Sequence, residues 1–212
     1  MASLNLIAPM FAWTALDEPE REHGSLISRN LCHLQDCVEK FADAAALIEF
    51  IDSNRLGMAH PAIMGDGPEA DALQARETQL IRWKMLAPRD APVTLYNYHE
   101  TRQTIDQQVV NCPIIKDNRD TTLLRKANNA FRDTFDGFDN VRTGVAHSGA
   151  LFRSPKERRV HVVPGTSGVI TPGMSGSTMF TSVKGMGSVT VDAAHAAALE
   201  KITALIFEAY KP

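Results

Sequence analysis

The fold is decided by the stretch ISRNLCHLQDCVEKFADAAALI, which runs from Ile27 to Ile48. Its apolar residues recur at alternating spacings of four and three, a pattern typical of a helix with one buried stripe. They are Ile27, Leu31, Leu34, Val38, Phe41, Ala45 and Ile48. Acidic residues around Pro19 favour a helix start, and Gly57 favours its end. The sequence therefore predicts one long helix whose stripe lies in a bundle core or, since the repeat is regular, against a second copy.

Shorter helices and one hairpin are predicted after this helix, bounded by prolines, glycines and capping residues. The helices cover about 68–86, 90–109, 120–133 and 140–148, the hairpin pairs 179–183 with 188–191, and a closing helix follows residue 192. Asp120, Asp139 and Asp192 are the expected N-caps, and Trp83 is expected to face inward with Leu80. Residues 58–68, 164–168 and 172–177 are interpreted as loops, and 160–163 as a strand.

These elements predict a mainly α fold, a helical bundle of about five helices with a small C-terminal β-hairpin and a closing helix. All 212 residues are assigned to a single domain. Residues 1–152 form the helical bundle, residues 153–191 the basic segment, loops and hairpin, and residues 192–212 the closing helix packed on the bundle.

Composition is that of an ordinary globular protein, with 44% hydrophobic and 22% charged residues. A net charge of -3 excludes a generally basic nucleic-acid binder but allows a local basic patch. Met1 to Trp13 lacks the basic start and cleavage site of a signal peptide, and no run reaches the roughly 18 apolar residues of a membrane helix. We therefore expect a cytoplasmic protein without membrane contact, whose cysteines Cys32, Cys37 and Cys112 are reduced.

One segment, from Val141 to Gly149, brings together a titratable base, a fixed cation and hydroxyl groups. Thr143 and His147 stand at i and i+4, so a helix places the hydroxyl directly below the imidazole. Arg142 comes five residues before His147 and lies roughly 140° around the same helix. The long arginine side chain reaches across part of that gap, and Gly144 places no side chain between them.

This grouping suits chemistry at a phosphodiester. A neutral histidine can take a proton from a ribose hydroxyl, while an arginine holds phosphate oxygens by paired hydrogen bonds. Arg142, Thr143 and His147 are therefore the candidate catalytic residues. The basic run behind them supplies the candidate nucleic-acid-binding residues Arg153, Lys156, Arg158 and Arg159.

The segment resembles the R-x(4-6)-H signature of HEPN domains, with Arg142 and His147 as the two motif residues. HEPN domains are all-helical bundles with this motif on a late helix, and the chain up to about Phe152 is similar to them. The resemblance implies a homodimer with two motifs facing one cleft, acting as a metal-independent endoribonuclease or binding RNA or nucleotides without cleavage. Active members usually carry Asn, Asp or His after the motif arginine. Thr143 stands there in this chain, which favours binding over cleavage.

A structural interpretation of the same segment stays open, in which Arg142 pairs with Asp139 or Asp136 and His147 stabilises the end of its helix. No metal and no cofactor are expected. His99 and Glu100 begin the H-E-x-x-H pattern of metalloproteases, but Gln103 replaces its second histidine.

Two further functions are open alternatives. A non-enzymatic interaction protein would dimerise through the apolar stripe of the long helix or through the hairpin around Phe180. A small-molecule-binding protein would use a pocket between helices, lined by Tyr96, His99 and Trp83. Tyr96, His99 and Arg102 share one helix face, which would line a polar cleft or, more simply, face solvent.

Overall fold

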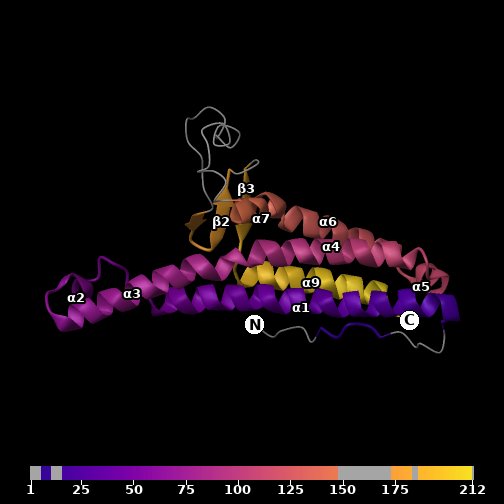
Figure 1. Cartoon of the computed structure of the whole chain (residues 1–212), viewed down its shortest axis with the longest axis horizontal. Coiled ribbons are helices and arrows are strands. Elements are labelled where there is room, and N and C mark those ends of the chain that lie inside the picture. Colours follow the sequence, from indigo (N-terminus) through magenta and orange to yellow (C-terminus); the bar gives the residue numbers. More distant parts are fainter. Residues whose placement is uncertain (1–5, 11–15, 148–172, 183–185, 212) are drawn as a thin grey trace.

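The computed structural model describes residues 6–10, 16–147, 173–182 and 186–211 and shows a mainly helical protein with a small antiparallel sheet. This confirms the predicted fold class. Figure 1 shows the long helices lying side by side, with the sheet raised above them near the middle of the molecule. No helix in the described ranges is long and apolar enough to cross a membrane.

Helix α1 (Glu18–Asn54) is the longest of the described helices. It begins at Asp17 and Pro19 and ends before Arg55, as predicted. The predicted stripe is buried along its whole length, from Ile27 at 0% exposed to Ile48 at 3%. It packs against α4 (Ala91–Val109) and α9 (Ala193–Ala209), which lie alongside α1 in Figure 1. The stripe therefore forms the core of this chain and is not available to a second copy.

Helices α2 (Pro61–Met64) and α3 (Pro68–Leu86) form an arm at one end of the molecule, and the short 3-10 helix η2 (Ala87–Arg89) joins it to α4. The α3 bounds match the prediction, whereas α2 lies in a segment interpreted as loop. The inward placement of Trp83 was wrong, because its side chain is 44% exposed. Lys84 of α3 contacts Asp52 of α1, Glu77 contacts Arg55 just after α1, and Trp83 lies outside that face.

Helices α5 (Pro113–Asn118) and α6 (Thr121–Thr134) return the chain along α9. Asp120 caps α6 as predicted, since its carboxylate accepts from the amides of Thr122 and Leu123 at 2.8 and 3.0 Å. The Asp120 amide also donates to the carbonyl of Ala209 at the end of α9. At the other end of α9, Asp192 accepts from the amide of His195 and caps the helix, again as predicted.

Strands β1 (Gly173–Ser175), β2 (Thr178–Thr181) and β3 (Gly187–Thr190) form the antiparallel sheet in the order β1-β2-β3. The predicted hairpin corresponds to β2 and β3 and is confirmed. The loop interpretation of 172–177 was wrong where β1 forms, because a turn at Gly176, with φ +62°, folds β1 back on β2. The strand expected at 160–163 lies outside the described residues.

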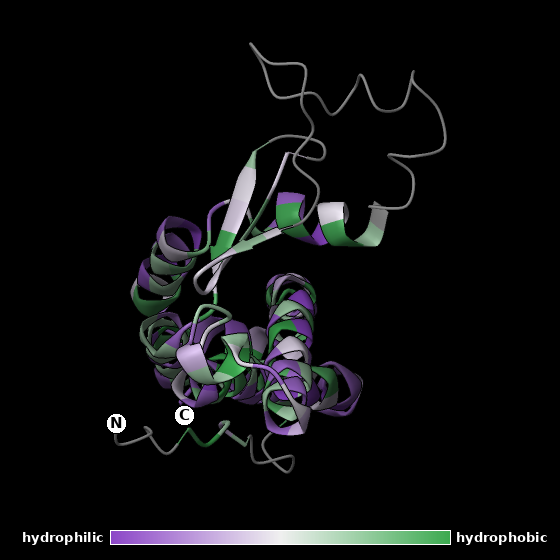
Figure 2. Ribbon diagram, turned by 90° about the vertical axis from the view of Figure 1, so that its left-hand side faces the viewer, coloured by the Kyte–Doolittle hydropathy of each residue, from purple (hydrophilic) through white to green (hydrophobic). Residues whose placement is uncertain are grey.

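The sheet lies over α7 (Phe138–His147), and both stand on one side of the bundle, as the end-on view of Figure 2 shows. A single core cluster continues from the bundle into this part through Val141, Met179 and Val189. The candidate motif is therefore carried by a helix that is packed between α4 and the sheet.

Candidate functional site

Helix α7 is placed by a turn and by a close approach to the sheet. Gly137 has φ +81°, and its carbonyl accepts from the amide of Val141, whose side chain is fully buried. A Cβ on Gly144 would lie 2.6 Å from Oγ1 of Thr181. Asp139 lies in the first turn of the helix. Its prediction as an N-cap was wrong, because the tight turn at Gly137 starts the helix earlier.

The Arg142 guanidinium has two partners, a carboxylate at its edge and an aromatic ring at its face. Its Nη2 and Nε atoms lie 3.0 and 3.1 Å from Oδ1 of Asp139, one turn earlier on α7. The guanidinium also stacks on α4, with its central carbon 3.9 Å from the ring centre of Tyr96. The Arg142 side chain is 32% exposed, so the group lies at the surface with a fixed orientation.

Asp139 was one of the two partners named for Arg142 from the sequence, whereas Tyr96 was missed. The carboxylate could be found because an i, i+3 pair meets on any helix. No local spacing connects Arg142 to a ring on another helix. From the sequence, Tyr96 was placed on a polar face of α4 and in a candidate pocket, and neither interpretation pairs it with Arg142.

Thr143 and His147 keep their predicted relation on α7, one helical turn apart. Thr143 is 7% exposed, which places it on the inner side of the helix. His147 is the last residue of α7, and its side chain lies outside the described part of the chain. Arg153, Lys156, Arg158 and Arg159 also lie outside the described residues, so their nucleic-acid-binding role stays a prediction.

The polar face of α4 that carries Tyr96, His99 and Arg102 is covered by neighbouring helices. The His99 ring stacks on Phe131 of α6 with ring centres 6.1 Å apart, and Phe138 of α7 lies 5.8 Å away. The guanidinium of Arg102 lies over the same Phe131 ring at 5.2 Å. The face expected to line a polar cleft or to face solvent is therefore partly buried, because α6 and α7 pack on it.

The proposed pocket between Tyr96, His99 and Trp83 is not formed by these side chains. Arg142 covers Tyr96, aromatic rings cover His99, and Trp83 points outward from the arm. Within the described ranges there is also no group of three histidine, cysteine or acidic residues placed to hold a metal ion. Cys32, Cys37 and Cys112 are free thiols, the last two buried.

The chain matches no protein-family model, and neither the curated proteins nor the solved structures compared with it yielded a match. The resemblance to HEPN domains therefore stays a prediction. Function has to be argued from the geometry of particular side chains, because a shared fold alone would not establish it.

Proposed function

We propose that the protein is a HEPN-like RNA-directed protein, in which Arg142 binds the phosphate backbone. The supporting observation is the preorganised guanidinium. Asp139 holds one edge of it, the Tyr96 ring holds one face, and Nη1 has no partner among the described residues. A cation fixed in this way loses little side-chain entropy on binding, and arginine matches a phosphate by paired hydrogen bonds.

Binding is favoured over cleavage within this proposal. Thr143 is buried, so its side chain lies inside the fold rather than facing a ligand at the surface. Cleavage would need His147 to take the proton of a ribose 2′-hydroxyl while the 2′-oxygen forms a bond to phosphorus. The bond from phosphorus to the 5′-oxygen would then break, and that oxygen would receive a proton. Arg142 would stabilise the charge that builds on the phosphate.

The RNA proposal is tested by fluorescence anisotropy with a labelled single-stranded RNA of about 20 nucleotides. Arg142→Ala should weaken RNA binding at least tenfold, because it removes one charge-assisted contact that contributes about 1.4 kcal/mol or more. Arg132→Ala is the matched control, because Arg132 also pairs with a nearby aspartate but is 73% exposed on α6. Its affinity should stay within twofold of the parent protein.

The same samples separate binding from cleavage. The RNA is incubated with the protein in excess EDTA and analysed on a denaturing gel. The gel shows whether cleavage occurs without a metal ion. If it does, His147→Ala should remove cleavage and leave most of the RNA affinity. The proposal fails if the parent protein binds no RNA, or if a folded Arg142→Ala variant binds as well as the parent.

A homodimer belongs to the same proposal, with two copies of α7 facing one RNA. The apolar stripe of α1 cannot form its interface, since it is buried in the chain itself. The interface should therefore involve the α7 side of the molecule. Light scattering coupled to size exclusion would test this, and a monomer at about 100 μM would contradict it. We also place this activity in the cytoplasm, where free thiols persist.

A further inference from the structure

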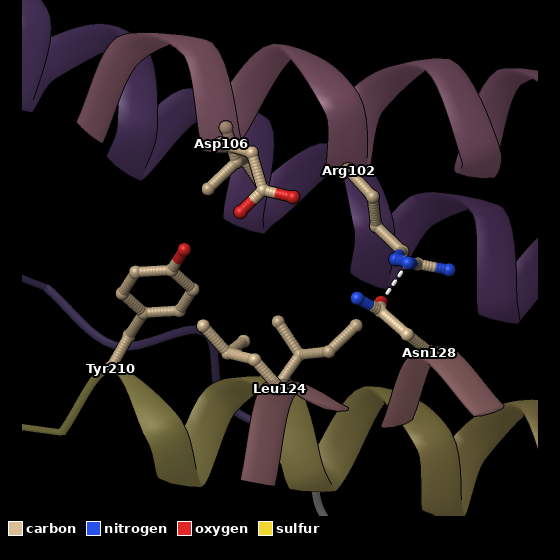
Figure 3. A pocket seen from close by; sticks show the side chains of 7 residues that line it. Arg102, Asp106, Leu124, Asn128 and Tyr210 are labelled. Atoms are coloured by element: carbon tan, nitrogen blue, oxygen red, sulfur yellow. Dashed lines mark hydrogen bonds between the residues drawn. The ribbon is translucent and has the colours of Figure 1, made fainter. Parts of the chain in front are cut away.

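A cavity lies between α4, α6 and α9, away from the Arg142 site (Figure 3). It is a depression half open to solvent, and its empty space of about 260 Å³ includes that open part. One part of its wall is aliphatic and is made by Ile105, Leu124 and Ile206. The remaining wall is polar and is made by Arg102, Asp106, Asn128 and Tyr210. Such a mixture of an apolar wall and a few polar groups is typical of small-molecule sites.

Two buried hydrogen-bond donors in this region, one in the cavity wall and one beside it, have no acceptor among the described residues. Tyr210 is only 3% exposed, and its hydroxyl lines the cavity without an acceptor. Figure 3 shows the hydroxyl on the side of the ring that faces Asp106. The Nε atom of Arg119 is likewise buried and unpaired, although its Nη1 lies 3.6 Å from Asp106. Buried donors left without acceptors destabilise a fold, so each one needs an explanation.

Burial raises the pKa of Tyr210 to about 12, with the Asp106 carboxylate adding to the effect and the Arg119 guanidinium opposing it. The hydroxyl is therefore protonated at neutral pH and remains a donor. An acceptor in the cavity would satisfy it.

Arg102 brings a positive charge to the same cavity without a compensating ion pair. Its guanidinium donates to the side-chain carbonyl of Asn128 and lies over the Phe131 ring. No carboxylate of the described residues lies within ion-pair distance of it, and Asp106 is paired with Arg119. Burial lowers the pKa of Arg102, since it disfavours the charged form. Leaving such a charge unpaired is unfavourable, and an anion beside it would relieve that cost.

We propose that this cavity binds a small organic anion, a short aliphatic carboxylate. Its carboxylate would accept from Tyr210 Oη and from Arg102, and its chain would pack on Ile105, Leu124 and Ile206. A doubly charged ion such as phosphate fits less well, because Asp106 repels two charges more strongly than one and the aliphatic wall gives phosphate no apolar contact. The site is separate from the RNA proposal and does not depend on it.

The ligand class is tested by NMR titration of the whole chain with butyrate, with butylamine and with inorganic phosphate. Butyrate should give saturable shifts in the amides of α4, α6 and α9, with a Kd of about 1 mM for so small a ligand. Butylamine should give none. If butylamine binds as tightly as butyrate, the cavity does not select an anion. If phosphate binds more tightly than butyrate, the ligand is not an aliphatic carboxylate.

Two variants tie the binding to the cavity. Tyr210→Phe should reduce butyrate affinity at least fivefold, while the ligand-free protein unfolds at the same temperature or higher, because an unsatisfied hydroxyl has been removed. Arg102→Gln should reduce the affinity at least tenfold, and Arg125→Gln, at an exposed position of α6, should change it less than twofold. The proposal would be overturned if the parent protein shows no saturable butyrate binding, or if Tyr210→Phe and Arg102→Gln both bind butyrate as tightly as the parent protein.

Discussion

Tyr98 and Thr203 form a hydrogen bond in the middle of the core, where neither side chain is exposed. The Tyr98 hydroxyl lies 2.9 Å from Oγ1 of Thr203, and that Oγ1 donates to the carbonyl of Leu199 at 2.8 Å. Thr203 is therefore the acceptor for Tyr98. Because burial raises the pKa of Tyr98 far above its ordinary value, the hydroxyl stays protonated and remains a donor at neutral pH.

This order of donors predicts an asymmetric mutational effect. Thr203→Val should destabilise the protein by about 2–3 kcal/mol, because it leaves the Tyr98 hydroxyl buried without an acceptor. Tyr98→Phe should destabilise it by only about 1 kcal/mol, since Thr203 still bonds to Leu199. Urea unfolding followed by circular dichroism measures both. Equal effects, or a larger effect for Tyr98→Phe, would show that the donor order is different.

Replacing Gly144 by alanine should destabilise the protein, in contrast to the usual effect of this change on a helix. On a helix, glycine to alanine normally stabilises by about 1 kcal/mol. Here the new Cβ would lie 2.6 Å from Oγ1 and 3.0 Å from Cβ of Thr181, a fully buried residue. Gly144→Ala should therefore destabilise by about 1–3 kcal/mol. In a double-mutant cycle with Thr181→Ser, part of that loss should be recovered, and a stabilised single variant would contradict the packing.

At this scale the sequence could predict contacts along one helix and no others. The pairing of Arg142 with Asp139 follows from their spacing, as do the caps at Asp120 and Asp192. The cavity went unnoticed because Tyr210 meets Arg102 only in three dimensions. The one available signal was Arg102 and Asp106 at i and i+4 on one predicted helix, which indicates charges directed towards the same place.

Among the elements, the corner between α1 and the arm depends on one carboxylate. Glu77 of α3 is 2% exposed and accepts from Arg55 Nε at 2.7 Å and from the amides of Leu56 and Gly57 at 3.1 and 3.2 Å. Burial alone would raise the pKa of this carboxyl. The hydrogen bonds from Arg55, Leu56 and Gly57 outweigh it, so the pKa lies below its usual value.

Glu77→Gln should therefore lower the stability by about 1–3 kcal/mol at pH 7, because an amide cannot accept all three bonds. A carboxyl whose pKa is lower in the folded state contributes its full stability above its unfolded pKa, near 4.5, and loses it as the pH falls through the folded value. The gap between parent and variant should thus narrow as the pH falls below 4.5. Urea unfolding between pH 3 and 7 measures it, with the exposed Glu100→Gln as control. A gap independent of pH would contradict the role of the charge.

A helix could be predicted from the sequence where apolar residues recur with a helical period over a long stretch and clear boundary residues flank it. The prolines and glycines around α1, α3 and α4 gave bounds close to those observed. The missed elements, α2, η2, α5 and β1, are three to six residues long. Segments this short carry no periodic signal, and their structure depends on the neighbours they pack against.

On the scale of the whole molecule, stability should be distributed unevenly. The arm buries few side chains, and those of α3 are Ala70, Glu77 and Leu80. The centre of α1 packs on both α4 and α9. Hydrogen exchange followed by mass spectrometry should show the slowest amides in peptides covering 27–48 and 95–109 and much faster exchange across 58–76. Glu77→Gln should accelerate exchange in the arm and leave α9 unchanged, whereas uniform protection would contradict this distribution.

The position of α9 has a consequence for how the chain folds during synthesis. The helix fills the space between α1 and α6, yet roughly 140 residues separate Asn54 from Ala193. At about 5–20 residues per second, the ribosome needs about 7–28 s to reach α9 after finishing α1. During that interval the apolar stripe of α1 lacks one of its native partners. The nascent chain should therefore be a client of chaperones that recognise exposed apolar helices, and native structure should form only after α9 has been made.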